Sequence, residues 1–231
     1  MTAFQRLRDA IQHAVYAIID PPIALLLRCG ATPNMMTTVG LLGNLAAAVL
    51  IIVAAYSTSF EAVMGLPVRY GLLGWAGGMT LFFSIFDMVD GRMARTAHLE
   101  SRFGAFYDSV LDRYCEILTL LAIAFFFMLT GHHAYALWTA LALMGSVMVS
   151  YTRARAEALD CDCKVGLMQR PERVVITAAG LLLTGLLQDV VADSFSPLLL
   201  LAVPMLVIAV LANITAIVRI FHVHKRMTFD I

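Results

Sequence analysis

Six apolar stretches occupy most of the chain, and each is long enough to cross a membrane. A transmembrane helix needs roughly 20 mostly apolar residues. The stretches that meet this requirement lie at about 36–56, 71–91, 105–130, 134–156, 172–190 and 196–219. Lipid offers no hydrogen-bond partner to an open backbone, so we expect each stretch to be α-helical. The pattern predicts an all-α, polytopic integral membrane protein with six transmembrane helices.

The N-terminal residues show a different pattern, with single apolar residues at helical spacing and polar residues between them. This pattern is typical of an amphipathic helix that lies on a membrane surface. We therefore expect an interfacial helix over residues 1–20, which Pro21 and Pro22 end or redirect. A poorly ordered tail is the alternative. The apolar residues of the pattern are Phe4, Leu7, Ile11, Val15 and Ile18.

The composition excludes several classes of protein. Hydrophobic residues make up 61% of the 231 residues, charged residues 14%, and the mean hydropathy is +0.84. Soluble domains have about 25% charged residues, so a soluble, disordered or fibrous protein is excluded. The formal net charge is zero, so no attraction to nucleic acid is expected. Little of the chain lies outside the six stretches, and we expect one membrane domain over residues 1–231.

The basic residues of the connecting segments lie almost entirely on one side of the predicted membrane. The opposite segments hold only Arg69. By the positive-inside rule, both termini and the basic side are cytoplasmic, in a cell membrane of bacterial or archaeal type. The basic residues on that side are Arg6, Arg8, Arg28, Arg92, Arg95, Arg102, Arg153, Arg155, Lys164, Arg170, Arg173, Lys225 and Arg226.

Four aspartates lie where two of the predicted membrane helices approach the cytoplasm. Asp87 and Asp90 are three residues apart near the end of the second stretch, and Asp108 and Asp112 are four apart near the start of the third. These spacings place each pair on one helix face. The short basic connection between the stretches makes the two helices antiparallel neighbours. We expect the four carboxylates to converge at the cytoplasmic edge of the membrane.

Carboxylates that gather in this way repel one another and need neutralisation. Arg95 and Arg113 could provide part of it. Hard divalent cations provide it better, because oxygen ligands select Mg²⁺, Mn²⁺ or Ca²⁺. Four aspartates on adjoining helices suit a two-metal site, whose ions lie ~3.5–4 Å apart. The alternatives are a buried salt-bridge cluster that joins two helices, and the ion relay of a transporter, which usually lies near the middle of the bilayer.

Small residues accompany the aspartates at fixed spacing. Gly91 follows Asp90, Ala94 lies one helical turn further, and Gly104 lies one turn before Asp108. Residues of this size let a flat group or a ligand come close to the backbone. Arg95 adds a bidentate group suited to phosphate. Glycine also serves helix packing in membranes, which would be enough for the other glycines of these stretches.

Taken together, eight positions resemble the signature of the CDP-alcohol phosphotransferase family, without a gap or a substitution. The family is also called CDP-alcohol phosphatidyltransferase, and its six-helix arrangement is similar to the one predicted above. The matching positions are Asp87, Asp90, Gly91, Ala94, Arg95, Gly104, Asp108 and Asp112.

The resemblance implies a metal-dependent transferase of phospholipid biosynthesis. Asp87, Asp90 and Asp108 would ligate two divalent ions, Mg²⁺ or Mn²⁺, and Asp112 would act as the general base or as a further ligand. The donor would be a CDP-linked lipid, typically CDP-diacylglycerol. A hydroxyl of a polar alcohol would attack its β-phosphorus, and CMP would leave. The family also implies a homodimer in the lipid bilayer.

The resemblance further assigns the residues that bind the nucleotide. Gly91 and Ala94 would give the cytidine room, and Arg95 would hold the diphosphate. The segment 33–37 resembles the family's P-N-x-x-T segment, which helps to enclose the nucleotide. Alone, it would predict only a helix start, with a proline turn and a threonine at or near the N-cap. The expected nucleotide- and diphosphate-binding set is Pro33, Asn34, Thr37, Asp90, Gly91, Ala94, Arg95 and Gly104.

A second polar cluster bears on the acceptor alcohol. It contains too many cations for an uncharged alcohol and suits an acceptor that bears phosphate, although ordinary positive-inside charge is the alternative. The S-Y-x-[K/R]-A-R-A-E and R-P-E-R runs resemble the phosphatidylinositol phosphate synthase branch, in which these residues receive the phosphate of inositol phosphate. Arg153 stands where lysine is more usual. The expected acceptor set is Ser150, Arg153, Arg155, Arg170 and Arg173.

Other acceptors remain as alternatives. Phosphatidylglycerophosphate synthases use glycerol 3-phosphate, but they usually continue the motif as D-P-x-x-D-K, whereas this chain has Ser109 and Arg113 at the differing positions. Acceptors without phosphate, such as inositol or serine, come next, and an ion-coupled transporter is the alternative from another class. We expect Glu157 and Glu172 to orient or pair with the arginines of the second cluster.

Overall fold

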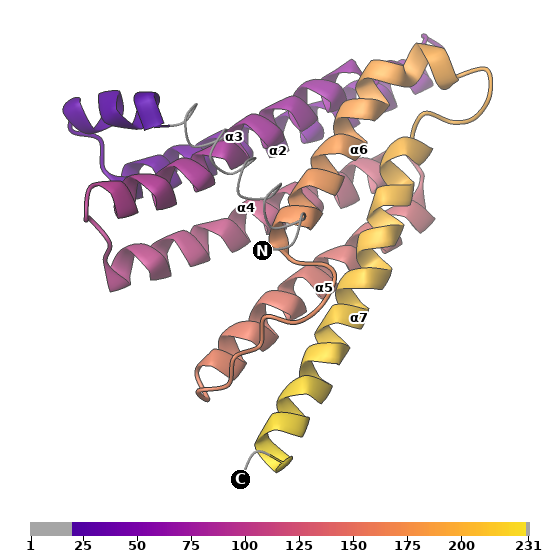
Figure 1. Cartoon of the computed structure of the whole chain (residues 1–231). Coiled ribbons are helices and arrows are strands. Elements are labelled where there is room, and N and C mark those ends of the chain that lie inside the picture. The colour runs from indigo at the N-terminus through magenta and orange to yellow at the C-terminus, as the bar shows by residue number, and fades with distance from the viewer. Residues whose placement is uncertain (1–19, 230–231) are drawn as a thin grey trace, which may run out of the picture.

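The computed structural model describes residues 20–229, and every regular element within that range is a helix (Figure 1). A short helical segment at 20–28 precedes the long helices. Each predicted apolar stretch corresponds to one long helix, which confirms the all-α membrane architecture. The long helices are α2 Pro33–Val63, α3 Gly71–Thr96, α4 Arg102–Leu129, α5 His133–Glu157, α6 Arg170–Val191 and α7 Leu199–Phe229.

The number of membrane spans needs a correction. Within residues 20–229, five helices are long and apolar enough to cross a membrane, and α4 is the long helix that fails this criterion. The reason is its charge, because Asp112, Arg113 and Glu116 follow Asp108 into the middle of the helix. By length and composition five of the six predicted spans therefore qualify, so the count of six is not exact by this criterion. Helix α4 is nevertheless similar in length to the other long helices and packs against α2 and α5. The charges that disqualify α4 are those of the candidate site.

The predicted interfacial helix over 1–20 lies outside the described residues, except for Asp20. Residues 20–28 are helical and include Pro21 and Pro22. Asp20 forms an ion pair with Arg92 of α3, with 2.9 Å between Oδ1 and Nε. This pair and the burial of Ile23 against Met93 fix the segment beside the end of α3.

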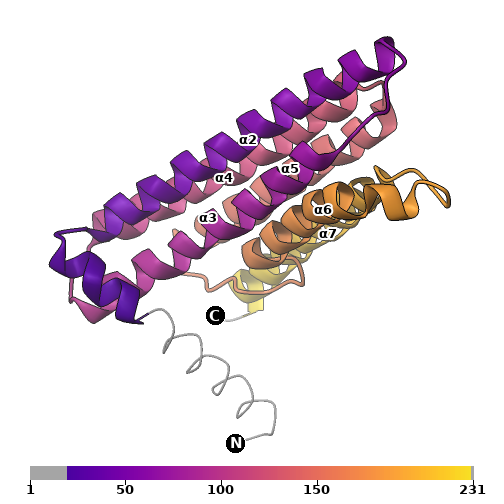
Figure 2. The same cartoon turned by 90° about the horizontal axis from the view of Figure 1, so that it is seen from above.

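The long helices pack in a connected bundle. Helix α2 lies against α3 and α4, α3 lies against α6, and α5 lies against α7. Figure 2 shows α2 running along α3 and α4, with α6 and α7 lying together. The core between them is almost entirely apolar and includes Ile51, Leu73, Phe126, Leu181 and Met205.

Glycine permits two close helix contacts that set the position of α3. A Cβ atom added to Gly77 would lie 2.5 Å from the backbone nitrogen of Leu182, so the backbones of α3 and α6 touch. A Cβ atom added to Gly43 of α2 would lie 2.0 Å from the ring of Phe83 on α3. Close helix approach at small residues is the usual means of packing in membranes. Helix α3 is thereby held between α2 and α6.

The helix ends next to the site are set by local capping. Ser101 is the N-cap of α4, and its hydroxyl accepts a hydrogen bond of 2.9 Å from the backbone N–H of Gly104. Thr32 is the N-cap of α2 and accepts from the N–H of Met35 at 3.3 Å. We expected a threonine within 33–37 at or near this cap. The cap is one residue earlier, and Thr37 lies inside the helix.

Candidate active site

Three aspartates from two helices form a compact cluster of oxygen ligands. Asp87 and Asp90 come from the last turns of α3 and Asp108 from the first turns of α4, joined by a connection over residues 97–101. Each offers a carboxylate oxygen, and these oxygens lie within 4.8 Å of one another. The periodicity of two neighbouring antiparallel helices produces this convergence, as the spacing predicts.

The surroundings of the cluster fit a divalent cation. Asp90 is 4% exposed and accepts a hydrogen bond of 2.6 Å from the hydroxyl of Thr37. Oδ1 of Asp108 is buried and has no hydrogen-bond partner within residues 20–229. A buried carboxylate oxygen without a partner is costly. A hard cation ligated by all three residues would satisfy it, so the residues present fit Mg²⁺ or Mn²⁺.

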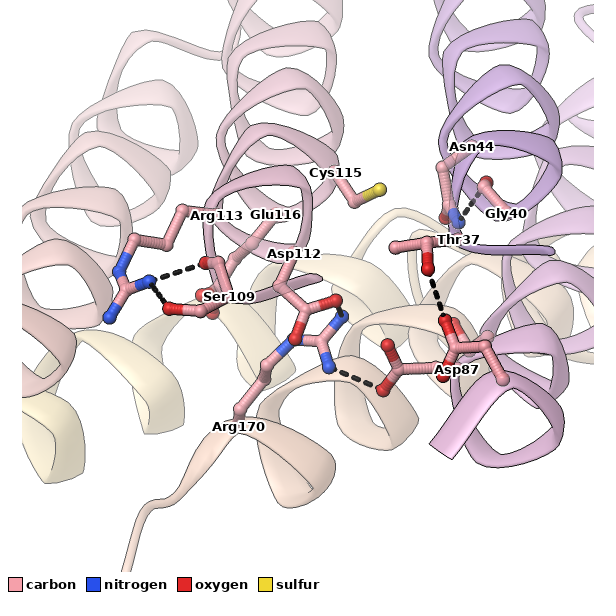
Figure 3. Close-up of polar contacts among 12 residues, drawn as sticks. Thr37, Gly40, Asn44, Asp87, Ser109, Asp112, Arg113, Cys115, Glu116 and Arg170 are labelled. Carbon is pink, nitrogen blue, oxygen red and sulfur yellow. Dashed lines mark hydrogen bonds and ion pairs between the residues drawn. The ribbon is translucent and has the colours of Figure 1, made fainter. Parts of the chain in front are cut away.

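The fourth aspartate, Asp112, is not one of these three but shares an arginine with Asp87. Arg170, at the start of α6, lies between Asp112 and Asp87, and its two terminal nitrogens each lie 2.5 Å from one of the two carboxylates (Figure 3). We expected Arg95 and Arg113 to neutralise part of the aspartate charge, whereas Arg170 does so here. This residue was assigned to the acceptor cluster, and the structure connects it to the metal-site carboxylates as well.

A cavity of about 210 Å³ opens beside Asp90 and Asp108. Gly104 is tightly placed in its wall, because an added Cβ atom would lie 2.9 Å from Oγ of Ser101 and 3.3 Å from Oδ1 of Asn34. All the residues that the motif predicts for the nucleotide line this cavity, which we call the motif cavity. These residues are Pro33, Asn34, Thr37, Asp90, Gly91, Ala94, Arg95 and Gly104.

A larger cavity of about 640 Å³ lies on the other side of the aspartates, between α4, α5, α6 and α7. Four of the five residues predicted for the acceptor line it, and we call it the arginine cavity. Arg155 does not line it and is exposed, because it lies on another face of α5 from Arg153. The polar and charged lining residues are Asp108, Ser109, Asp112, Arg113, Ser150, Arg153, Glu157, Gln169, Arg170, Arg173 and Arg219.

Carboxylates hold two of the arginines in place. Arg173 is 1% exposed and donates two hydrogen bonds to Glu116, of 2.5 Å from Nε and 2.9 Å from Nη2. Arg153 pairs with Glu157 at 2.8 Å, one turn away on α5. The predicted role of Glu157 is thus confirmed by the contact. Glu172 is exposed and makes no ion pair within residues 20–229, and the partner of Arg173 is Glu116 instead.

The two cavities share part of one wall. Ala105 and Asp108 of α4 line both, so the metal-site aspartate stands at the boundary between them. A group bound in one cavity can therefore reach a group bound in the other at Asp108. Of these two cavities, Asp112 lines the arginine cavity and not the motif cavity. The arrangement suits a transfer reaction between two substrates that enter from different sides of a metal site.

Two residues of this site, Glu116 and Arg219, were not predicted from the sequence. Glu116 lies one helical turn after Asp112 on α4, so the helical spacing of the acids could have indicated it. Arg219 lies far along α7 in an otherwise apolar run. A charged residue inside a predicted membrane helix is a general signal of function, and here that signal was available.

Comparison with known proteins agrees with this geometry. The CDP-alcohol phosphatidyltransferase family matches residues 30–221. The phosphatidylinositol phosphate synthase of Corynebacterium glutamicum is 32% identical over 171 residues, which cover 73% of this chain and 71% of that protein. The archaetidylinositol phosphate synthase of Methanothermobacter thermautotrophicus is 35% identical over 141 residues, 61% of this chain and 65% of that protein.

Solved structures of a related enzyme have the same fold. The phosphatidylinositol phosphate synthase of Mycobacterium tuberculosis with CDP-DAG bound matches with a TM-score of 0.71 and 29% identity. The match covers 90% of this chain and 94% of that one. The same enzyme in complex with manganese and citrate matches with a TM-score of 0.72 and 29% identity, covering 90% of this chain and 89% of that one.

Proposed function

Because the chain belongs to the CDP-alcohol phosphatidyltransferase family, we propose that it transfers a phosphatidyl group from CDP-diacylglycerol to inositol phosphate and releases CMP. The observation that carries this proposal is the pair of cavities that meet at Asp108. One is lined by the family motif and the other by five arginines. A neutral acceptor would bring no negative charge to those arginines, whereas a phosphate monoester has the charge and the oxygen acceptors that complement them.

The motif cavity takes the CMP part of the donor. Gly91 and Ala94 have no bulky side chain to fill the cavity, so a flat base and its ribose can lie against α3. The Arg95 guanidinium is exposed at the rim and lies close to Gly91, where an added Cβ atom would be 3.7 Å from its Nη1. Its planar fork suits the diphosphate. Thr37 orients Asp90 through their 2.6 Å hydrogen bond.

The metal ligands are the three clustered aspartates. Asp87, Asp90 and Asp108 would hold the divalent ions, Mg²⁺ or Mn²⁺ and two in number by family resemblance. When bound, the ions supply charge neutralisation at the diphosphate and at the departing CMP. Ser101, Asn34 and Gly104 close the wall beside them and keep the aspartates at the boundary of the two cavities.

The arginine cavity takes the acceptor. Ser150, Arg153 and Arg173 line it from α5 and α6, and Arg170 extends it to the metal-site carboxylates. The pair of Arg153 with Glu157 is largely exposed and contributes little stability. Arg153 can therefore exchange Glu157 for a phosphate at small cost. Arg173 is held in a fixed orientation at the cavity wall by Glu116 and by the carbonyl of Met168, to which its Nη1 donates at 3.1 Å.

Asp112 is placed to receive the proton of the attacking hydroxyl. It lines the arginine cavity next to Asp108, and Arg170 fixes its carboxylate. The hydroxyl oxygen of the acceptor forms a bond to the β-phosphorus of the donor, and its proton passes to a carboxylate oxygen of Asp112. The bond from that phosphorus to the bridging oxygen breaks, and CMP leaves with the electron pair.

We place the site at the cytoplasmic face of the membrane. The residues assigned above lie at one end of the helix bundle, and the connections at the opposite end hold Arg69 as their one arginine or lysine. By the positive-inside rule, the site and both termini are cytoplasmic. A soluble nucleotide and acyl chains in lipid can meet only at such an edge. The homodimer and the single domain over 1–231 stay predictions.

The experiment that tests the proposal is CMP release by the full chain, purified in detergent. The assay contains CDP-diacylglycerol and Mg²⁺, with inositol phosphate, glycerol 3-phosphate, inositol and serine as parallel acceptors. We expect release with inositol phosphate alone. Release with glycerol 3-phosphate instead would overturn the acceptor and keep the aspartate mechanism. Release with inositol or serine would overturn the assignment of the arginine cavity to a phosphate.

A further inference from the structure

A third cavity lies inside the helix bundle, between α2, α3, α4 and α6. It consists of two adjoining hollows of about 30 and 10 Å³, which we call the inner cavity. The larger hollow extends away from the helix ends that carry the site, to Thr80, Thr119 and Thr177. The residues that line both hollows are Asn44, Ser84, Asp112, Cys115 and Arg170.

The size and the lining of the inner cavity suit water. A buried water needs about 10–15 Å³ of such volume, so the larger hollow has room for about two waters and the smaller for about one. A sugar or an acyl chain is too large for either. Cavities that stay empty in proteins are apolar, whereas each of the four helices contributes a hydroxyl, amide or charged group to this one.

The uncharged polar groups of the lining offer mainly acceptors. The hydroxyls of Thr80, Ser84 and Thr119 each donate to the carbonyl four residues earlier on the same helix, at 2.7–2.9 Å. The side-chain amide of Asn44 donates in the same way at 2.9 Å. A hydroxyl has one hydrogen and two lone pairs, so the oxygen atoms keep acceptor capacity after these bonds. Water can donate to them.

Arg170 supplies a matching donor. Its two terminal nitrogens bind Asp87 and Asp112, whereas its Nε is buried and has no hydrogen-bond partner within residues 20–229. A buried donor without an acceptor is costly. A water at the Arg170 end of the inner cavity can accept from Nε and donate to the side chain of Asn44 or Ser84. It then has partners of the number that buried waters usually have.

We propose that the inner cavity is a water-binding site and that its ordered waters position Arg170 between Asp87 and Asp112. The inference rests on the proposed function and deepens it, because Arg170 fixes the carboxylate that receives the proton. Asn44 and Ser84 are then positioning residues. They act on the reaction through water and Arg170, without contact with either substrate.

Helix packing is the competing explanation for the polar lining. Serine and threonine that bond to their own helix are common where membrane helices approach closely. Packing needs no water, so the volume of each side chain would then decide which substitutions are tolerated. The two explanations differ at Asn44. Leucine keeps the volume and removes the polar group, whereas serine leaves a gap that another water can enter.

The first test detects the water directly and needs no substrate. Hydroxyl radicals formed by X-rays oxidise side chains next to bound water, and mass spectrometry locates the products. Cys115 lines both hollows (Figure 3), whereas Cys163 is fully buried and lines none of the cavities described for residues 20–229. We expect faster oxidation of Cys115 than of Cys163 in the purified full chain, and Asn44→Leu should abolish the difference. Equal rates in wild type, or an unchanged difference in Asn44→Leu, would overturn the proposal.

The second test is the kinetics of CMP release. Asn44→Leu should lower kcat about tenfold and Asn44→Ser about two- to threefold, with the KM for CDP-diacylglycerol unchanged. Thr119→Val removes an acceptor at constant volume and should lower kcat about threefold. Thr184→Val is the matched control and should keep kcat. Thr184 is also buried and bonded to its own helix, at 2.8 Å, but it does not line the inner cavity.

The reverse order, with Asn44→Ser worse than Asn44→Leu, would assign the lining to packing and overturn the proposal. If Asn44→Leu does not fold, Thr119→Val decides, and a kcat equal to that of Thr184→Val overturns the proposal. If wild type releases no CMP with any acceptor, the proposed function fails. The oxidation rates of Cys115 and Cys163 then decide the water site by themselves.

Discussion

The motif cavity and the arginine cavity adjoin at one aspartate, yet they are built in different ways. The motif cavity is small, about 210 Å³, and its lining comes from residues 33–37 and 90–108. The arginine cavity is about 640 Å³ and takes its lining from four helices, between Ala105 and Arg219. The first selects by close approach of the backbone and by its metal ligands. The second selects by charge that distant helices bring together.

The two cavities also differ in how their charges are balanced. Arg95 is exposed at the motif cavity, so water solvates its charge. Several arginines of the other cavity are partly or fully buried, and carboxylates such as Glu116 and Asp112 hold two of them. Buried pairs add little net stability, but the loss of one partner is severe. The arginine cavity therefore depends on Glu116, a residue that does not line the cavity itself.

The largest effect is expected where the cavities meet. Asp108→Asn removes a charged ligand from the three-aspartate cluster, so turnover should fall at least about a thousandfold, beyond the range of a single binding contact. CMP release measures turnover, and titration with Mn²⁺ measures metal affinity, which should weaken in parallel. Asp162→Asn, in an exposed connection, is the control. An Asp108→Asn enzyme with normal turnover would remove Asp108 from the metal site.

A stability test sharpens the second half of the comparison. Glu116→Gln leaves the guanidinium of Arg173 buried without its carboxylate, which should cost about 3–5 kcal/mol of unfolding free energy. Unfolding of the detergent-solubilised protein, followed by circular dichroism, measures this change. The double variant Glu116→Gln with Arg173→Met should recover much of the loss, because no buried charge remains. A single variant as stable as wild type would show that the pair is solvated.

The same contrast explains what the sequence could predict. Much of the lining of the motif cavity was predicted, because its aspartates follow helical spacing on two helices joined by a short connection and the family motif supplies most of the other residues. The pairing of Arg173 with Glu116 joins residues that are 57 apart in the chain, and only the tertiary structure brings these two side chains of α6 and α4 together. Arg219 was missed for the same reason. Helix spacing reports the faces of one helix, not the partner that each face meets.

The next prediction concerns the motif cavity alone. Arg95→Ala should raise the KM for CDP-diacylglycerol about ten- to a hundredfold, because a charged hydrogen bond to the diphosphate contributes about 1.5–3 kcal/mol. The KM for inositol phosphate should stay unchanged. Steady-state kinetics with each substrate varied in turn measures both. Arg69→Ala, at the opposite end of the bundle, is the control. A shift in both KM values would mean that the two cavities bind as one unit.

The smallest effect is expected at Arg155, and it decides where the arginine cavity ends. The sequence motif groups Arg155 with Arg153, but residues two apart on a helix do not share a face, and Arg155 is exposed outside the cavity lining. Arg155→Ala should change the KM for inositol phosphate less than about twofold, whereas Arg153→Ala should raise it about tenfold. Each variant removes one arginine, and the two differ in the face of α5 from which the charge is removed. If Arg155→Ala raised the acceptor KM as much as Arg153→Ala, the acceptor would have to reach around α5, and the cavity lined from α4, α6 and α7 could not be its whole binding site.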